Sequence, residues 1–232
     1  DGSRQGRVVF IGDSDHIVPL FGVRGLNNGI ADAHNIGWKL GRVLNGRAGE
    51  DLLDSYTPER RGATLDVFAN ATKSARFMTP PSHGWRIMRD AALGLALEHP
   101  FAGELANPRQ MTPFTYAGSP AVLPDDPGFA GGAAPGAAMP DAALADGFLS
   151  DRIGSGYTLV CFDEELSDKV SRLPDAPEVV CLDFPGDASR MLGANASSAY
   201  LVRPDLHIAA RWLEASAGRI ADAMKTLSFR KD

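Results

Sequence analysis

The amino-acid sequence predicts a protein of mixed α and β structure, in which a mainly helical first part is followed by an alternating α/β part. Two observations support this. Residues 27–44 carry apolar side chains three or four positions apart, the spacing of one face of a helix. From residue 156 onward, short runs rich in β-branched and aromatic residues alternate with short helical segments.

The first predicted element is a buried strand over residues 7–11, because this run is β-branched and aromatic. Gly12 and Asp13 end the strand. A loop over residues 14–25 follows, and helix-breaking residues mark it at Pro19, Gly22 and Gly25.

Three helices are predicted next, over residues 27–44, 52–77 and 85–97. The second has an interruption at residues 55–59, where Pro58 is placed to start a fresh helix. The apolar face predicted for the first helix consists of Ile30, Ala33, Ile36, Gly37, Leu40 and Leu44. Glycine within a helix also suggests the close approach of another group.

Residues 100–140 are rich in Gly, Pro and Ala and are interpreted as an extended segment. After it we predict strands and helices in the order β-α-β-α-β-β-α, which is that of a thioredoxin-like domain. The strands are 157–162, 178–184, 198–202 and 207–212, and the helices are 164–173, 187–192 and 216–227. The predicted domains are residues 1–115, a linker at 116–140, and residues 141–232.

Composition narrows the class of protein. The chain has 232 residues, 44% hydrophobic and 22% charged, with a net charge of −6, which argues against nucleic acid as a partner. No run approaches the roughly 18 apolar residues of a membrane span, so no membrane partner is expected. The two cysteines, Cys161 and Cys181, lack metal-ligand spacing. They indicate a reducing, cytoplasmic location, and their positions within predicted strands suggest buried, inert thiols.

Chemistry is concentrated in the first 45 residues. A strand that ends at Asp13 places a carboxylate where ligands of open α/β sheets bind, and such a group can accept hydrogen bonds from ligand hydroxyls. The following helix begins near Leu26 and Asn27, and its first N–H groups have no partner within the helix. Together with the helix dipole, these groups favour an anion or a polarised carbonyl. A histidine here, such as His16 or His34, is more often structural than catalytic.

Residues 6–44 resemble the second flavin-binding motif of the class A flavoprotein monooxygenases, the para-hydroxybenzoate and phenol hydroxylase group. The matching residues, in order, are Gly12-Asp13, His16, Pro19, Gly22, Gly25-Leu26-Asn27, Gly29, Asp32-Ala33, Asn35 and Trp38-Lys39-Leu40. Residues 52–56 and 59–61 also match.

The resemblance implies that Asp13, beside Gly12, binds the ribityl hydroxyls of FAD, and that the amides of Leu26 and Asn27 face the flavin's pyrimidine carbonyl. Pro19 and the loop through Gly22 to Gly25 would lie beside the isoalloxazine ring. Asp15 stands where the family has alanine, and we expect it to point outward. FAD is the implied cofactor, NAD(P)H the co-substrate, a small aromatic compound the substrate, and a homodimer the assembly. No metal and no catalytic side chain are predicted.

The C-terminal part resembles the thioredoxin-like domain of the phenol hydroxylase branch, through residues 136–141, 146–147, 157–159 and 199–205. A redox-active thioredoxin needs CxxC at the start of its first helix, where this sequence has residues 162–165, Phe-Asp-Glu-Glu. We therefore expect a packing or dimerisation module without dithiol activity.

The family also binds the ADP half of FAD through a G-x-G-x-x-G turn, which this sequence lacks. The chain is therefore expected to be a C-terminal fragment, inactive on its own, of an enzyme that hydroxylates aromatic rings with FAD, NAD(P)H and O2. Two alternatives stay open: a non-catalytic dimerisation module, and a related flavin oxidase or halogenase.

Overall fold

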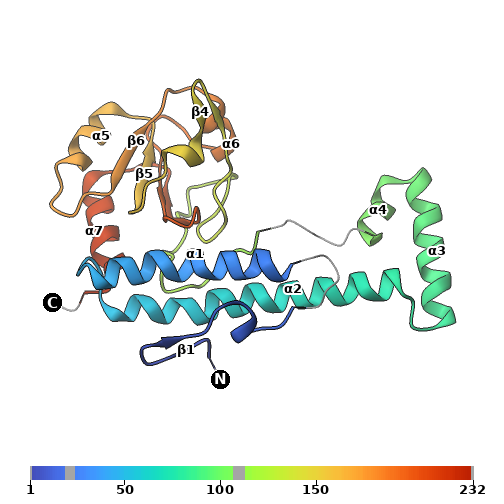
Figure 1. Ribbon diagram of the computed structural model, residues 1–232. Coiled ribbons are helices and arrows are strands. Elements are labelled where there is room, and N and C mark those ends of the chain that lie inside the picture. The colour runs from blue at the N-terminus through green and yellow to red at the C-terminus, as the bar shows by residue number, and fades with distance from the viewer. Residues whose placement is uncertain (1, 19–23, 107–112, 231–232) are drawn as a thin grey trace. The chain divides into compact units, whose positions relative to one another are not determined.

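The computed structural model describes residues 2–18, 24–106 and 113–230 (Figure 1). The contacts divide the chain into two compact units. Unit 1 contains residues 1–33 and 60–114, and unit 2 contains residues 34–59 and 115–232. The predicted mixture of α and β structure is confirmed. The domain boundaries proposed from the sequence stay a prediction.

The N-terminal strand is much shorter than expected. Only Val8–Val9 (β2) is a strand, and it pairs with Arg4–Gln5 (β1) in an antiparallel hairpin. The prediction of a buried strand over residues 7–11 is wrong, since Val8 is 55% exposed and Ile11 is 40% exposed. Within the described part of unit 1, β2 pairs with β1 alone. No further strand of this sheet therefore covers the apolar side chains of residues 8–11.

The helices follow the prediction more closely. They are α1 (Gly25–Leu44), α2 (Tyr56–Met78), α3 (His83–Glu98) and α4 (Pro100–Ala106), with a 3-10 helix, η2, at Glu50–Ser55. Pro58 lies in the first turn of α2, where its missing N–H costs little. The Ser82 hydroxyl caps α3 by accepting the N–H of Trp85.

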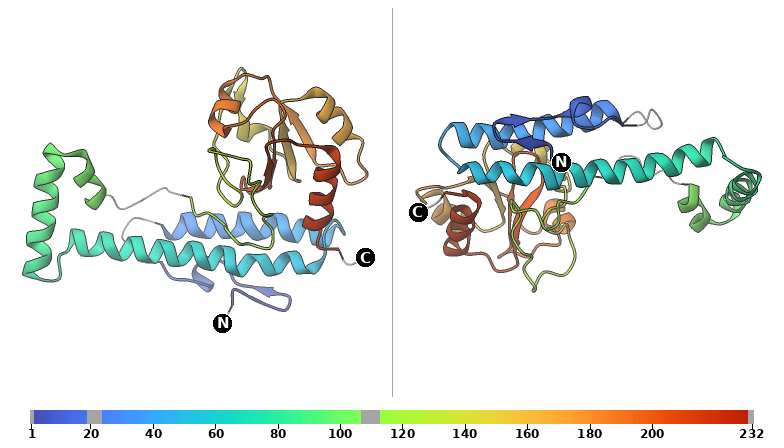
Figure 2. Two further views of the ribbon diagram at one scale, coloured as in Figure 1. Left: turned by 180° about the vertical axis from the view of Figure 1, so that it is seen from behind. Right: turned by 90° about the horizontal axis from the view of Figure 1, so that it is seen from below.

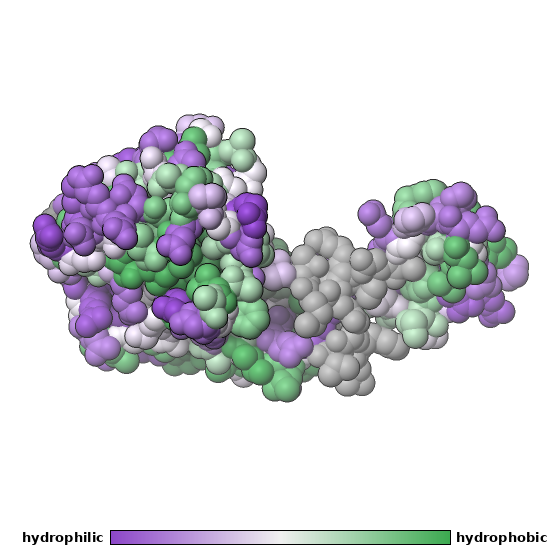
Figure 3. Space-filling view, turned by 90° about the horizontal axis from the view of Figure 1, so that it is seen from above, coloured by the Kyte–Doolittle hydropathy of each residue, from purple (hydrophilic) through white to green (hydrophobic). Residues whose placement is uncertain are grey.

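Helix α4 was not predicted, because residues 100–140 were interpreted as extended. Pro100 occupies the first position of α4, where its fixed φ angle favours a helix. Helices α3 and α4 pack against each other as a helical hairpin (Figure 2). Figure 3 shows apolar surface on this hairpin, where Leu97 and Phe101 are 90% and 68% exposed.

The predicted apolar face of α1 is wrong. Ile30 is 59% exposed and Leu44 is 82% exposed. The residues that α1 buries are largely polar: Asn28, Asp32, Asn35 and Lys39, together with Ile36 and Trp38. The reason is that the partners of this buried face are charged groups, as described below.

Unit 2 contains a four-stranded sheet in the order β6-β5-β7-β8. The strands are β5 (Thr158–Cys161), β6 (Glu178–Cys181), β7 (Ala199–Val202) and β8 (Ile208–Trp212). Strand β5 is parallel to β6 and antiparallel to β7, and β7 is antiparallel to β8. The helices are α5 (Glu164–Ser171), α6 (Asp187–Leu192) and α7 (Ala217–Leu227). This is the predicted β-α-β-α-β-β-α order.

Before the sheet, residues 113–142 contain no helix or strand, and a short hairpin of β3 (Ala143–Leu144) and β4 (Gly147–Phe148) follows, with a 3-10 helix, η3, at Leu149–Arg152. The hairpin was not predicted. Two-residue strands carry too little alternation to be recognised in a sequence.

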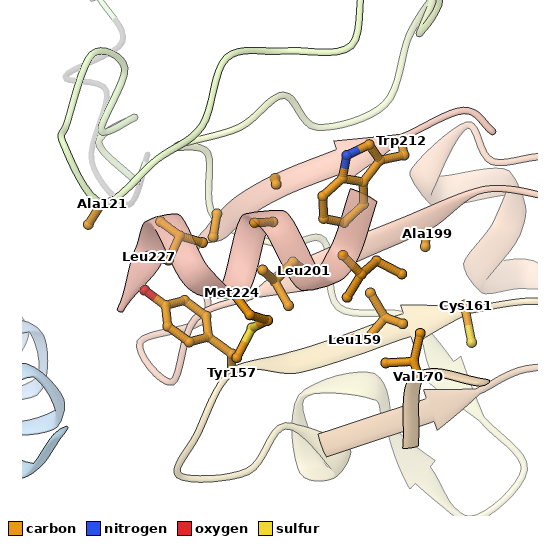
Figure 4. Packing of buried hydrophobic residues seen from close by; sticks show 14 of the residues in the cluster. Ala121, Tyr157, Leu159, Cys161, Val170, Ala199, Leu201, Trp212, Met224 and Leu227 are labelled. Carbon is orange, nitrogen blue, oxygen red and sulfur yellow. The ribbon is translucent and has the colours of Figure 1, made fainter. Parts of the chain in front are cut away.

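Each face of the sheet has its own core. On one face, Leu159 and Leu201 pack with α5 and α7 (Figure 4). Trp38 of α1 belongs to the same cluster. On the other, Val160 and Tyr200 pack with α6 and with residues from the extended segment. This alternation of side chains along β5 and β7 is the two-residue period of strands.

The two cysteines differ. Cys161 is fully buried, and burial raises its pKa to about 12. Cys181 ends the edge strand β6 and is exposed, so the prediction that both thiols are buried is wrong for Cys181. An edge strand has a neighbour on one side only, which leaves its last side chain uncovered. Across the described ranges, no helix combines the length and apolarity needed to cross a membrane.

Candidate functional site

The motif in unit 1 centres on a 3-10 turn, η1, at Gly12–Ser14. Gly12 has a φ angle of +54°, a conformation that glycine adopts without strain. Asp13 is exposed, and among the described residues its carboxylate accepts no hydrogen bond. The Asp13 carboxylate is therefore accessible from solvent.

The turn lies directly against α1. A Cβ atom added to Gly12 would lie 3.7 Å from the Cα of Gly29, and one added to Gly29 would lie 3.6 Å from the Cα of Gly12. The close approach expected at Gly29 is thus made by Gly12. Gly29 lies four residues after the first residue of α1, Gly25.

Asp32 holds the turn in place. Its fully buried Oδ2 accepts the backbone N–H of Gly12 at 2.9 Å and lies 2.7 Å from Nε2 of His16. Its Oδ1 accepts Nε of Arg60 at 2.6 Å, and Arg60 also donates to Oδ1 of Asn28 at 3.1 Å. His16 is therefore part of the framework, in line with its structural interpretation.

The start of α1 supplies the second half of the motif. Helix α1 begins at Gly25, two residues earlier than predicted, and Leu26 and Asn27 are exposed in its first turn. The N–H of Asn28 donates to the carbonyl of Arg24 at 2.9 Å. The backbone N–H groups that precede Asn28 lie in the first turn of α1, where N–H groups have no acceptor within the helix.

The structure thus brings Gly12, the neighbour of Asp13, against Gly29 of α1, four residues after the first residue of that helix. Pro19 and Gly22 lie outside the described residues. The arrangement fits FAD: a free carboxylate for hydroxyl groups, a glycine without a side chain beside it, and helix N–H groups for a polarised carbonyl. These roles stay predictions.

A second polar network lies in unit 2, around the buried carboxylate of Glu59. Arg203 donates to its two oxygens at 2.6 and 2.9 Å. Lys39 and Asn35 donate to Oε2 at 2.7 and 2.6 Å, and the Ser119 hydroxyl donates to Oε1 at 2.5 Å. The network joins α1, the first turn of α2 and the extended segment to the sheet.

Asp205 completes the network. It accepts two hydrogen bonds from Arg203, at 2.9 and 2.6 Å, and one from Asn35 at 3.1 Å. The guanidinium of Arg203 also lies over the rings of Trp38 and Tyr116, at 5.2 Å from each centroid. The cations Lys39 and Arg203 balance the two carboxylates, which makes burial of the group tolerable.

The pKa values reflect this balance. Burial alone would raise the pKa of Glu59, but Arg203 and Lys39 outweigh it and lower the pKa to about 2. Burial likewise opposes ionisation of Asp205, yet Arg203 holds its pKa well below the usual range. Burial lowers the pKa of Lys39 to about 8, against the attraction of Glu59.

Sequence reasoning included Asp32 and residues 59–61 in the motif but assigned them no role. A signal was present in the spacing. Asn28, Asp32, Asn35 and Lys39 follow one another at intervals of three or four residues, which places them on one face of a helix. Within the described ranges, no group of three or more His, Cys, Asp or Glu side chains is placed to hold a metal ion.

One known family is similar to the first part of the chain. Residues 1–71 match the family described as FAD binding domain. These residues include the turn at Asp13, all of α1 and most of α2. Residues 1–71 are thus similar to a FAD-binding domain, and the cofactor that this similarity indicates is FAD.

More particularly, the chain is related to flavoprotein aromatic hydroxylases. It is 28% identical to a 3-(3-hydroxy-phenyl)propionate/3-hydroxycinnamic acid hydroxylase of Mycolicibacterium gilvum, over 95% of this chain and 44% of the relative. A hydroxylase of the same name from Mycobacterium avium is 43% identical over 33% of this chain and 13% of that protein. The chain therefore spans less than half the length of the curated relatives it matches.

Two solved structures resemble the chain along nearly its whole length. The rebeccamycin biosynthetic enzyme RebC with reduced flavin is 31% identical, with a TM-score of 0.71, over 98% of this chain and 46% of that one. Aklavinone-11 hydroxylase in complex with FAD and aklavinone is 27% identical, with a TM-score of 0.72, over 98% and 44%.

Proposed function

We propose that this chain is the C-terminal part of a FAD-dependent monooxygenase that hydroxylates a phenolic or aromatic substrate with NAD(P)H and O2. The observation that carries the proposal is the turn at Gly12–Ser14, which carries the exposed Asp13 carboxylate and lies against Gly29 of α1. The match of residues 1–71 to a FAD-binding domain supports it.

In this proposal Asp13 binds the cofactor by accepting hydrogen bonds from ribityl hydroxyls. Gly12 leaves room for that approach, and Asp32 keeps the turn in place by accepting the Gly12 N–H. The amides of Leu26 and Asn27 face the pyrimidine carbonyl of the flavin, where the helix dipole stabilises negative charge. FAD, when bound, supplies the redox chemistry that activates dioxygen.

Substitution of Asp13 in the full-length protein tests the proposal. Asp13→Asn should weaken FAD binding by about ten- to a hundredfold, the equivalent of about 1.5 to 3 kcal/mol for hydrogen bonds to a charged group. Asp15→Asn is the matched control. Asp15 lines a cavity with His16, Arg61 and Thr64 that does not include Asp13, and its substitution should change FAD affinity little.

Flavin fluorescence during equilibrium dialysis measures the affinity. Unchanged FAD binding by Asp13→Asn, or a full-length protein without flavin absorbance, would contradict the proposed function. For the reaction, NAD(P)H oxidation should rise when 3-(3-hydroxyphenyl)propionate or another phenol is added, and a hydroxylated product should form. A halogenated or merely oxidised product would instead favour the related halogenase or oxidase.

We further infer that residues 141–232 form a thioredoxin-like domain without dithiol chemistry, which contributes to a homodimer of a cytoplasmic protein. The strand order β6-β5-β7-β8 and the strand directions support the fold. The start of α5, where a redox pair would lie, carries Glu164 and Glu165. Analytical ultracentrifugation of the full-length protein tests the dimer, and a monomer at micromolar concentration would refute it.

A further inference from the structure

A basic pocket lies in unit 2, where the end of α1 meets the loop before β6 and the segment after α7. The cavity measures about 280 Å³. Three arginines line it, Arg42, Arg47 and Arg230, and Asp175 is the one carboxylate among its described lining residues. Three guanidinium groups against one carboxylate leave the pocket with an excess of two positive charges.

Arg42 is the most enclosed of these cations. Its guanidinium lies 4.8 Å from the ring centroid of Tyr157, and its Nε is buried without a hydrogen-bond partner. One of its terminal nitrogens donates to the carbonyl of Arg47 at 3.3 Å. Among the described residues, no carboxylate lies within ion-pair distance of Arg42. Figure 4 shows Tyr157 beside Met224, which also lines the pocket.

Other enclosed arginines of the same unit are paired. Arg203 binds Glu59 and Asp205, and Arg211 binds Asp125 at 2.7 Å. Proteins pair cations that they remove from water, because an unpaired one is costly. Burial is the main cause of the lowered pKa of Arg42; the charges of Arg47 and Arg230 add to it, whereas Tyr157 and Asp175 oppose it without reversing it. Arg42 therefore lacks the anion that its counterparts have.

Arg230 and Arg47 leave donors available as well. One terminal nitrogen of Arg230 donates a hydrogen bond to the carbonyl of Gly46 at 2.6 Å, and the other terminal nitrogen lies 3.7 Å from Oδ2 of Asp175. Arg47 is exposed at the rim. Each guanidinium carries five N–H donors in a planar fork, so most of the donors around the cavity remain free for a ligand.

We propose that this pocket binds a phosphate group, either as free phosphate or as part of a phosphorylated small molecule. A phosphate dianion matches the two excess positive charges, and its oxygens match the forked geometry of guanidinium groups. Pro174 and Met224 add apolar wall that an attached organic group could contact. The proposal is independent of the proposed function.

Titration of the chain with inorganic phosphate, followed by calorimetry and by 31P NMR, tests the site. We expect saturable binding of one phosphate per chain, weakened about tenfold or more in Arg47→Gln and in Arg230→Gln by loss of a charge-assisted contact. Arg172→Gln is the matched control, since Arg172 has a 79% exposed side chain and does not line the cavity. Circular dichroism verifies that each variant is folded.

Asp175→Asn gives a prediction of opposite sign. It removes the carboxylate that competes with the ligand for Arg230, so phosphate should bind more tightly. The binding affinities of NADPH and NADH, and those of AMP and adenosine, are compared in the same titration. The comparison shows whether the natural source is a phosphorylated nucleotide or free phosphate. Absence of saturable binding, or equal weakening by Arg172→Gln and Arg47→Gln, would overturn the site in favour of general charge attraction.

Discussion

The substitution Arg203→Met probes the network around Glu59 most directly. Arg203 is fully buried and makes four hydrogen bonds, two to Glu59 and two to Asp205. Methionine keeps an unbranched apolar chain of similar reach against Trp38 and Tyr116 but removes the charge and every donor. Two buried carboxylates would then share the single cation of Lys39.

The size of the effect follows from burial. Removing one partner of a buried ion pair costs about 3 to 5 kcal/mol, because the remaining charge stays out of water without compensation. The depressed pKa of Glu59 gives a similar figure. A fall from its ordinary 4.5 to about 2 corresponds to about 3 kcal/mol of favourable interaction with the ionised form. Asn35 and Ser119 still donate to Glu59, which places the expectation near the lower end of the range.

Urea unfolding, monitored by far-UV circular dichroism, measures the change in the free energy of unfolding. The control is Arg152→Met, the same substitution in the exposed pair Arg152–Asp146, whose side chains are 48% and 67% exposed. Such a pair contributes at most about 1 kcal/mol. If Arg203→Met destabilises the chain no more than Arg152→Met does, the reasoning about the buried network is wrong.

Three further outcomes are expected. Between about pH 4.5 and 2, the free energy of unfolding of Glu59→Gln should fall by about 3 kcal/mol less than that of the unsubstituted chain. The reason is that the lowered pKa of Glu59 contributes stability that is complete above pH 4.5 and is lost as the pH falls toward 2. Urea midpoints across this range measure it, and identical acid limbs would contradict it. Asp32→Asn should destabilise unit 1 by about 3 to 5 kcal/mol and speed amide hydrogen exchange at Gly12, whose N–H bonds to Asp32; unchanged Gly12 exchange would show that this bond does not hold the turn. Iodoacetamide should label Cys181 in the native chain and Cys161 only after unfolding, as mass spectrometry of peptides can verify; equal native labelling would refute the difference in burial.

The C-terminal sheet and its helices could be predicted from sequence because each element carries its own local signal. The run at 157–162 is β-branched and aromatic, and Ser216 caps α7 one residue before the helix begins. The run at 7–11 carries the same signal but is largely exposed. Whether a strand is buried depends on partners far away in the chain, which local composition does not reveal.

The candidate site, too, could be predicted only in part from the sequence. The turn at Asp13 and the start of α1 could be predicted, because the order and spacing of the motif were recognisable. The supporting role of Asp32 was missed, since a charged residue in a helix is usually assigned to solvent. Its burial depends on Arg60, which comes from another helix and approaches only in the folded chain.

The neighbouring residues Glu59 and Arg60 have a consequence for how α2 can pair with α1. Glu59 contacts the cations Lys39 and Arg203, whereas Arg60, one position later, contacts the carboxylate of Asp32. A rotation of α2 by one residue in one sense would turn Arg60 toward the two cations, and a rotation in the opposite sense would turn Glu59 toward Asp32; either encounter is repulsive. The order of Glu59 and Arg60 therefore favours a single register of the two helices. A variant in which these two residues are exchanged should fail to pack, although its composition is unchanged.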